Sequence, residues 1–481
     1  MKKQTIFFAL ILLFLVASCS SDSKNRTSAE YLSAYMKDNS NVVVFGKIDV
    51  KQILEKADYK NVPKVSVLFV SEMKAYESAL DLGQSVHFAM EGPFDKEGNP
   101  ANVVAFMKVK NADSLASKIT SLGLMMQEES GMKYTQDNDV SIGIKENVAV
   151  FITRNGNYEG KTALKEAFEK TENDLSEGKV QEILSAKGDM IFGVSMQNLY
   201  TGSNTSLSNL PKDKKKQLEA MVNDSYIQST VSFEKGQAVF ESKNLFSKEL
   251  MDRMFFEEDP KATILSKLGK GNARIGLAFN MNMQKMESFL DDFAPDFKRE
   301  LTNSTFQMQM AMSTLGDKPL TNLLNGKIGM LMLGDMMKDG SLVPEANIHI
   351  GLGNKGQEVS EMLKAFFPNN SDIYGMKVQL NQKEITISSG KTTASSLNIP
   401  AFAVQFGKKG FTAFVNFEGM DLKSMDLQEG AKAFYALKNI TIEADNLGTK
   451  MIVKGNNSNQ NILKQIVDVY VKDLEKTIGA I

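Results

Sequence analysis

Few segments of this 481-residue chain combine residue types at a spacing that could do chemistry. One is Gly351-Leu352-Gly353-Asn354-Lys355-Gly356, which matches G-x-G-x-x-G. In a dinucleotide-binding fold such glycines let backbone amides hold a pyrophosphate at a helix N-terminus. That fold needs a parallel sheet, whereas the strands here are predicted to be antiparallel. We therefore interpret the segment as an ordinary strand-to-helix turn and expect no cofactor.

The chain contains only two histidines, His87 and His349, and each lies in an apolar segment that reads as a strand. A metal site usually needs three or four clustered ligands, and no His-x-x-x-His spacing is present. We expect hydrogen-bonded histidines at the surface of a sheet and no metal site. Gly193-Val194-Ser195-Met196-Gln197 lacks the second glycine of the G-x-S-x-G nucleophile turn, so it predicts no serine nucleophile.

Acidic residues are the remaining candidates, because a pair of carboxylates can hydrolyse a glycosidic bond. Candidates are Asp291-Asp292, Glu257-Glu258 and Asp49. Asp291 and Asp292 are neighbours on a predicted helix, so they point in different directions and cannot flank one bond. The sequence predicts no catalytic residue, and an envelope hydrolase acting on glycans or peptides stays an alternative.

The N-terminus has the pattern of an export signal. Met1-Lys2-Lys3 is cationic, Ile6 to Val16 is apolar apart from Ala9, and Ala17-Ser18-Cys19 follows. The apolar run is too short for a membrane-spanning helix, which needs about 20 residues. Val16-Ala17-Ser18-Cys19 resembles the bacterial lipobox. The resemblance implies that residues 1–18 are removed and that Cys19 carries the lipid anchor.

Residues 19–38 are predicted to be the lipid anchor and a flexible tether, since Ser20 to Ser28 is small and polar. Cys19 is the only cysteine, so no disulfide can form within the chain. Ser20 offers no evident inner-membrane retention signal, and Asp22 is the only acid directly after the cysteine. These features favour an outer-membrane lipoprotein that faces the periplasm rather than the cell surface.

Composition narrows the function classes. Lys and Arg number 56 against 58 Asp and Glu, so the net charge is −2. Proteins that bind nucleic acids usually carry a basic excess, and we expect no nucleic-acid partner. The one lysine cluster, at 212–216, follows Pro211 and reads as a solvated helix face. With no tryptophan in the chain, an indole face for stacking on sugars is excluded.

An internal repeat organises the rest of the chain. In the first half, strands are predicted at 41–50, 82–90, 103–109, 131–134, 140–144, 148–153, 190–194, 226–233 and 238–242, with helices near 51, at 114–122 and from 247. In the second half, strands are predicted at 272–281, 324–332, 346–352, 375–378, 384–388, 412–416, 440–444 and 451–454, with helices near 284, at 359–367 and at 462–477. The same landmarks recur in the same order.

Alternation of apolar and polar residues in these strands is typical of antiparallel sheets that are covered on one face. We predict an α+β fold of two related halves, each a mainly antiparallel sheet with helices packed on one face. The first repeat domain covers residues 39–256 and the second covers 268–481. The boundary falls around Glu257-Glu258-Asp259-Pro260.

The signal, the lipobox, the strand Val42-Val43-Val44 leading to Ile48-Asp49, and the repeated strand–helix units together resemble a known group. They are similar to the uncharacterised envelope lipoproteins of Bacteroidetes type, which form a domain-of-unknown-function family. The resemblance covers most of the chain and implies a fold, but no active site.

Three functions stay open. The first is a non-enzymatic, lipid-anchored binding or scaffolding protein with an envelope protein partner or an apolar ligand. Its contact surface is expected in the methionine-rich segments 281–286 and 308–312, although methionines at helical spacing more often belong to a core. The second is the carboxylate hydrolase. The third is a periplasmic carrier of lipid or lipoprotein, which needs a sheet around an apolar cavity.

Overall fold

The computed structural model divides the chain into two compact units, and each is described by itself. Unit 1 contains residues 1–208, 222–238 and 457–481, and unit 2 contains residues 209–221 and 239–456. The structure describes residues 26–37, 39–61, 76, 78–95, 97–137, 139–154, 160–169, 178–202, 210–258, 260, 262–303, 309, 312–333, 337–338, 341–342, 345–366, 371–373, 376–389, 396–420, 422 and 429–479.

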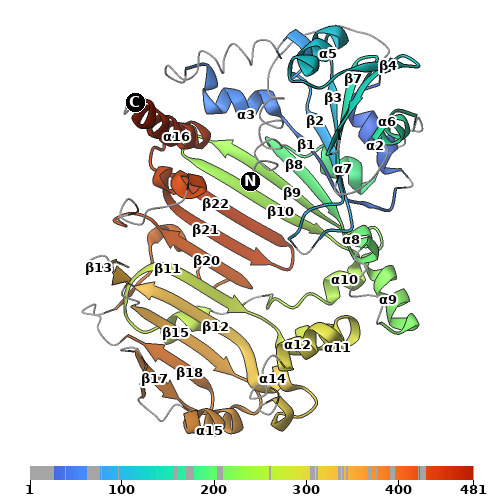
Figure 1. Ribbon diagram of the computed structural model, residues 1–481. Helices are drawn as coiled ribbons and strands as arrows, with labels where there is room; N and C mark the ends of the chain where they lie inside the picture. Colours follow the sequence, from blue (N-terminus) through green and yellow to red (C-terminus); the bar gives the residue numbers. More distant parts are fainter. Residues whose placement is uncertain are drawn as a thin grey trace. The chain divides into compact units, whose positions relative to one another are not determined.

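Unit 1 consists mainly of short strands with helices between them (Figure 1). Its elements are α2 (Ser28–Met36), β1 (Val42–Ile48), α3 (Val50–Ala57), η1 (Tyr59–Asn61), β2 (Val86–Glu91), β3 (Asn102–Lys108), α5 (Ala112–Ser121), β4 (Gln127–Glu129), β5 (Met132–Gln136), β6 (Val140–Lys145), β7 (Val148–Arg154), α6 (Gly160–Glu169), α7 (Lys179–Leu184), β8 (Met190–Ser195), α8 (Met196–Gly202), β9 (Tyr226–Glu234) and α16 (Ile462–Gly479).

The strands of unit 1 pair in the order β9-β8-β1-β2-β3-β7-β6-β5-β4, and every one of these pairs is antiparallel. The C-terminal helix α16 belongs to this unit and packs against α3. Its docking is fixed at Asn461, whose side-chain amide donates to the carbonyl oxygen of Phe233 at 3.1 Å.

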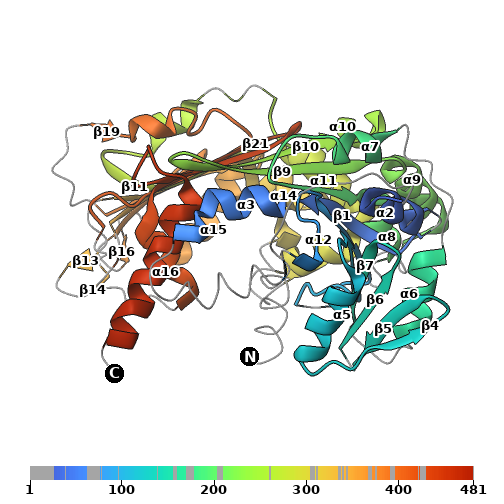
Figure 2. The ribbon, with the colours of Figure 1, turned by 90° about the horizontal axis from the view of Figure 1, so that it is seen from above.

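Helices cover both faces of this sheet, so the prediction of helices on one face is wrong for unit 1. On one face, Ile142 and Ile144 of β6 lie in a buried cluster with Leu115 of α5. On the other, Gly143 lies against Leu164 and Phe168 of α6. Figure 2 shows α5 and α6 on opposite sides of β5, β6 and β7. The strands here are apolar on both faces, and such strands need two covering layers.

Part of the predicted tether is also ordered. Residues 28–36 form α2, whose first turn is held by a capping box between Thr27 and Glu30. Tyr31 and Leu32 are buried in unit 1. The predicted tether of 19–38 therefore ends near residue 27, because burial of this helix outweighs the small, polar residues before it.

Unit 2 has a longer sheet. Its elements are α9 (Lys212–Val222), β10 (Gln237–Leu245), α10 (Lys248–Asp252), η2 (Ala262–Lys267), β11 (Gly271–Asn280), α11 (Met283–Phe293), α12 (Pro295–Asn303), α14 (Pro319–Leu323), β12 (Leu324–Leu333), β13 (Met337–Lys338), β14 (Ser341–Leu342), β15 (Ala346–Leu352), α15 (Gly356–Phe366), β16 (Ser371–Ile373), β17 (Met376–Leu380), β18 (Glu384–Ser388), β19 (Leu397–Asn398), η3 (Ala401–Ala403), β20 (Phe411–Asn416), η5 (Glu429–Ala436), β21 (Leu437–Asp445) and β22 (Gly448–Gly455).

The strands of unit 2 pair in the order β10-β22-β21-β20-β11-β12-β15-β18-β17-β16, and Figure 1 shows them side by side. Every pair from β22 to β16 in this order is antiparallel. The short strand β19 also pairs with β11, and this pair is parallel. The α+β fold class with a mainly antiparallel sheet is therefore confirmed.

The two units share a pairing pattern. In unit 1, β1 lies between β8 and β2, and β3 and β7 follow. In unit 2, β11 lies between β20 and β12, and β15 and β18 follow. The units are not continuous halves, because residues 457–481 belong with unit 1. The two repeat domains at 39–256 and 268–481 stay a prediction.

One face of the unit 2 sheet is covered by η2 and by the segment around η3. The buried cluster there contains Ile264, Leu268, Leu331, Phe406 and Phe414. Gly276 lies directly against the Phe414 ring, because only a residue without a side chain leaves room for that aromatic group.

In the described part of the chain, no helix is long and apolar enough to cross a membrane.

Candidate functional site

The predicted lipidation site, Cys19, lies outside the described residues, as does the whole predicted signal of residues 1–18. The described chain begins at Arg26, and α2 begins at Ser28. Arg26 follows Cys19 by seven positions, and a fully extended chain spans at most about 25 Å over that length. If Cys19 is acylated, unit 1 begins within that distance of the membrane surface.

His87 lies on β2 and contacts the first turn of α2. Its Nδ1 is 2.9 Å from Ser28 Oγ, which also donates to the carbonyl oxygen of Ser85 at 3.2 Å. Burial, together with the nearby Lys47 ammonium, lowers the pKa of His87 to about 4. A serine beside a neutral histidine could serve as nucleophile and base. Both side chains are more than 90% buried, however, so this pair joins α2 to the sheet and is closed to substrate.

His349 lies on β15 in unit 2 and is also buried. Burial lowers its pKa, and the nearby Lys267 adds to that effect, against the opposing pull of Glu384. Its Nδ1 is 3.9 Å from Glu384 Oε2, and it makes no hydrogen bond. The expected hydrogen bond is therefore present at His87 and absent at His349 Nδ1. The expected position at the surface of a sheet is wrong for both histidines, because both are buried. Among the described residues, no cluster of three metal-ligating side chains occurs.

Asp291 and Asp292 lie on α11 and point to different partners, as the sequence predicts. Asp291 accepts from Lys298 at 2.6 Å. Asp292 accepts from Lys214 at 2.6 Å and from Arg253 at 2.8 Å. Burial acts to raise the pKa of Asp292, but the hydrogen bonds from these two cations outweigh it and lower the pKa. The lysine cluster at 212–216 thus supplies an ion pair within unit 2, on the predicted helix.

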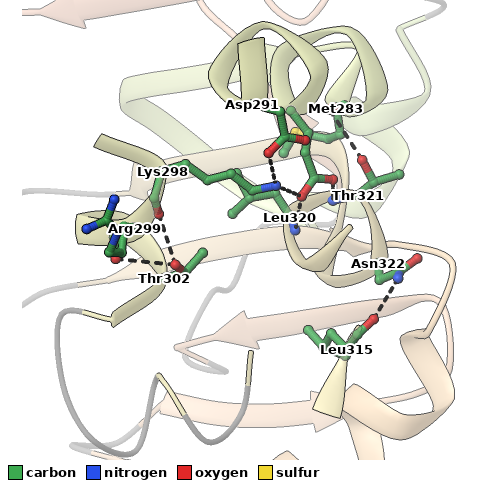
Figure 3. Close-up of polar contacts among 10 residues, drawn as sticks. Met283, Asp291, Lys298, Arg299, Thr302, Leu315, Leu320, Thr321 and Asn322 are labelled. Atoms are coloured by element: carbon green, nitrogen blue, oxygen red, sulfur yellow. Dashed lines mark hydrogen bonds and ion pairs between the residues drawn. The ribbon is translucent and has the colours of Figure 1, made fainter. Parts of the chain in front are cut away.

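The most heavily buried carboxylate near these aspartates is Glu287, also on α11 and only 1% exposed. It accepts from the backbone amides of Leu320 at 3.1 Å and Thr321 at 2.9 Å, which begin α14. The Lys298 ammonium lies 3.0 Å from the Glu287 carboxylate and 2.6 Å from the Asp291 carboxylate (Figure 3). Burial acts to raise the pKa of Glu287, and the hydrogen bonds outweigh it and lower the pKa. This network is satisfied and caps α14, so it serves structure.

Two further buried carboxylates lie in unit 1. Glu91 accepts from Tyr35 Oη at 2.6 Å, from Asn39 Nδ2 at 2.8 Å and from Asn102 Nδ2 at 2.5 Å. Asp189 accepts from Lys56 Nζ at 2.6 and 2.7 Å and from the backbone amide of Phe233 at 2.6 Å. Each carboxylate joins separate elements, and neither pairs with a second acid as hydrolysis of a glycoside requires.

The remaining sequence candidates have structural roles. Asp49 caps α3 through the backbone amide of Gln52 at 3.0 Å, Glu257 lies 3.8 Å from Lys327, and Ser195 accepts from the backbone amide of Asn198 at 3.2 Å. A Cβ atom on Gly353 or Gly356 would collide with backbone carbonyl oxygens of neighbouring segments. The glycine motif is therefore a tightly packed turn between β15 and α15.

The feature that stands apart is the second face of the unit 2 sheet. Cross-strand partners in an antiparallel sheet share one face, as do residues two apart along a strand. Three adjoining rows can be followed through the register. The central row is Met451, Ile442, Ala413, Leu277, Met330, Ile348 and Ile387. The row on one side is Val453, Ile440, Val415, Ile275, Met332 and Ala346, and the row on the other is Ala444, Phe411, Phe279, Ile328, Ile350 and Ile385.

We call these three rows the apolar sheet face. All 19 residues are apolar, and all except the two small residues Ala346 and Ala444 are only half-buried. On β22 the third row continues to Thr449, the partner of Ala444. The rings of Phe279 and Phe411 lie 4.9 Å apart across β11 and β20. Within unit 2, Ile385 packs against the buried cluster that contains Val359 of α15.

The opposite face of the same strands differs in kind. Thr412 and Phe414 are buried beneath η3, and farther out this face carries Thr441, Glu443 and Lys450. A half-covered antiparallel sheet normally turns its polar residues to water and its apolar residues to a core. The apolar sheet face has the residues of a core and stays partly open.

The described methionines of the two methionine-rich segments do not form the expected contact surface. Met283 and Met312 are buried, and Met281 and Met286 pack against the cluster of Met283, Leu290 and Leu320. Met308 and Met310 lie outside the described residues. The methionines that do reach the apolar sheet face, Met330, Met332 and Met451, come from strands.

Sequence reasoning located these strands and missed the face they form. The signal was present in β11, where Ile275, Leu277 and Phe279 are large while Gly276 and Ala278 between them are small. In β21, Ile440 and Ile442 alternate with Thr441 and Glu443. Alternation shows which residues share a face, but not whether that face is covered.

The comparisons with known proteins give little. No protein-family model matches the chain, and no curated protein matches it. Two crystal forms of TP0453 are similar at low level. Form III has a TM-score of 0.30 at 10% identity, over 47% of this chain and 82% of that one, and form I has a TM-score of 0.29 over 47% and 81%. Likeness this low establishes neither a shared fold nor a function.

Proposed function

We propose that this chain is a non-enzymatic, lipid-anchored envelope protein that binds an apolar partner on the apolar sheet face of unit 2. The observation that carries the proposal is that face. Soluble proteins rarely leave a large contiguous apolar patch in water, and such patches usually mark binding sites. The binary pattern of β21 and β22 favours the same reading, since Thr441, Glu443 and Lys450 lie on the opposite face.

The location rests on the N-terminus. Acylation at Cys19 would hold the chain at the membrane, because each buried acyl methylene contributes about 0.8 kcal/mol. We place it at the outer membrane, facing the periplasm, and among the Bacteroidetes-type envelope lipoproteins that its sequence resembles. The described carboxylates supply no pair suited to hydrolysis, so no specific observation favours the hydrolase.

A hydrophobic fluorescent dye tests the proposal, because such dyes brighten when they leave water for an apolar surface. The probe is N-phenyl-1-naphthylamine, and the protein is the mature chain carrying Cys19→Ser, which lacks acyl chains of its own. Ile442→Gln puts a polar group in the central row. Ile452→Gln is the matched control, since Ile452 is also half-buried but lies on the opposite face of the same hairpin.

We expect saturable dye binding that is weakened severalfold by Ile442→Gln and unchanged by Ile452→Gln. Equal urea midpoints for the two variants would show that the difference is not unfolding. Absence of saturable binding, or equal loss in both variants, would rule out the apolar sheet face as the binding site.

A further inference from the structure

We infer that the occupant of the apolar sheet face is an acyl chain of a membrane phospholipid. This inference rests on the function proposed above and names its ligand class. It draws on the chemistry of the three rows, on the hydrogen bonding of the strands that bear them, and on the width of the face.

The 19 residues of the three rows, on seven strands, include no charged residue and no hydrogen-bonding side chain. Two hydroxyl side chains border them at the ends of the rows, Thr449 beside Ala444 and Ser389 beside Ala346. A polar group pressed against such a surface loses its water and gains no partner, which costs free energy. The complementary occupant is therefore uncharged and carries no hydrogen-bonding groups where it touches the face.

Strands β21, β20, β11, β12 and β15 are each paired on both sides, so their amides and carbonyls are already used. Peptides that bind by strand addition need a free sheet edge, and these strands offer none. An extended peptide lying on the face would bury its own backbone groups unpaired. An acyl chain brings only methylene groups, which gain by leaving water.

Neighbouring strands lie about 4.8 Å apart, so the six intervals from β22 to β18 make the face about 29 Å wide. The hydrocarbon core of a bilayer is about 30 Å thick, so one leaflet's acyl chain is about half as long. The apolar sheet face can therefore hold a whole acyl chain along one of its rows. Met330, Met332 and Met451 lie within the rows, and flexible thioethers adapt to chains of irregular shape.

The source of the acyl chain follows from the proposed lipid anchor at Cys19. A lipoprotein tethered at Cys19 by fewer than ten residues stays beside a bilayer, where phospholipid is the abundant form of acyl chain. A free fatty acid and an amphipathic helix of a protein partner are the competing occupants, and the experiment separates both from phospholipid.

The test uses the mature chain carrying Cys19→Ser, incubated with phosphatidylethanolamine vesicles that contain a trace of phospholipid with a diazirine on one acyl chain. After illumination, the labelled peptides are identified by mass spectrometry. We expect adducts on β11, β12, β20, β21 and β22. Ile442→Gln should lower labelling about tenfold, and Ile452→Gln should leave it unchanged. A parallel arm replaces the phospholipid with a diazirine fatty acid.

Each other outcome counts against a defined part of the account. Labelling by the fatty acid but not by the phospholipid would overturn the assigned source. Adducts elsewhere, or labelling insensitive to Ile442→Gln, would overturn the assigned site. No labelling in either arm, with dye binding at the face retained, would overturn the acyl chain and leave the proposed function standing. Loss of both labelling and dye binding would overturn both.

Discussion

Buried polar residues in this protein connect helices and strands to one another through hydrogen bonds and ion pairs. Glu91 joins the end of α2 to β2 and β3 through Tyr35 and Asn102. Asp189 joins α3 to the backbone of β9 through Lys56 and Phe233. Buried carboxylates persist only when such partners replace water. These residues could be identified in the sequence as acids, but their partners lie 11 to 133 positions away, and local pattern does not report such distances.

His87 gives the clearest prediction at the residue scale. Its pKa is about 4 in the folded chain and 6.5 when exposed. Between these pH values the unfolded chain binds more protons than the folded chain does. The contribution of His87 to the free energy of unfolding is therefore complete above pH 6.5 and falls as the pH drops toward 4, by roughly 3 kcal/mol. Urea unfolding across this range should show the slope in the native protein and a reduced slope in His87→Gln.

His349 provides the control, because burial lowers its pKa as well. His349→Gln should keep the part of the slope that belongs to His87. An unchanged slope in His87→Gln would show that this histidine is not held neutral beside Ser28.

At the element scale, α14 depends on a residue from another helix. It begins at Pro319 and has no side-chain cap of its own. The Glu287 carboxylate of α11 supplies the cap, and the positive end of the helix favours its negative charge. Lys298 of α12 completes the contact at 3.0 Å, so one carboxylate holds three helices together.

Glu287→Gln should therefore destabilise the protein by about 2 kcal/mol. The amide nitrogen of glutamine cannot accept from a backbone amide, and the charge that pairs with Lys298 is lost. The urea midpoint measures the effect. Glu300→Gln, on the exposed side of α12, should leave the midpoint unchanged, and an equal shift in both variants would contradict the capping role.

Strands were predicted well because their signal is local. Alternation in 272–281 and 440–444 located β11 and β21 to within a few residues. The helix α2 was missed although Thr27 and Glu30 have the spacing of a capping box. The small, polar residues 20–28 predict a tether that extends to residue 38. The packing of Tyr31 against Phe106 and Phe168, far along the chain, holds residues 28–36 as a helix instead.

At the scale of the whole molecule, the sequence does not predict which segments pack together or which sheet faces other segments cover. The sequence predicts which strands exist, but not that residues 457–481 join unit 1 or that helices cover both faces of its sheet. It also shows that Ile440 and Ile442 share a face, but not that this face stays half-buried. Coverage depends on contacts between distant segments, and it is coverage that makes the apolar sheet face a candidate site.

Occupancy of that face in the living envelope tests the account most directly. A photoreactive amino acid is placed at Ile442, or at Ile452 as control, in the full-length chain with Cys19 intact. Cells are illuminated, and adducts on the purified chain are identified by mass spectrometry. We predict an adduct from position 442, of a mass that matches phospholipid, and none from position 452. Equal labelling at both positions, or none at 442, would contradict the assignment of the apolar sheet face as the binding site.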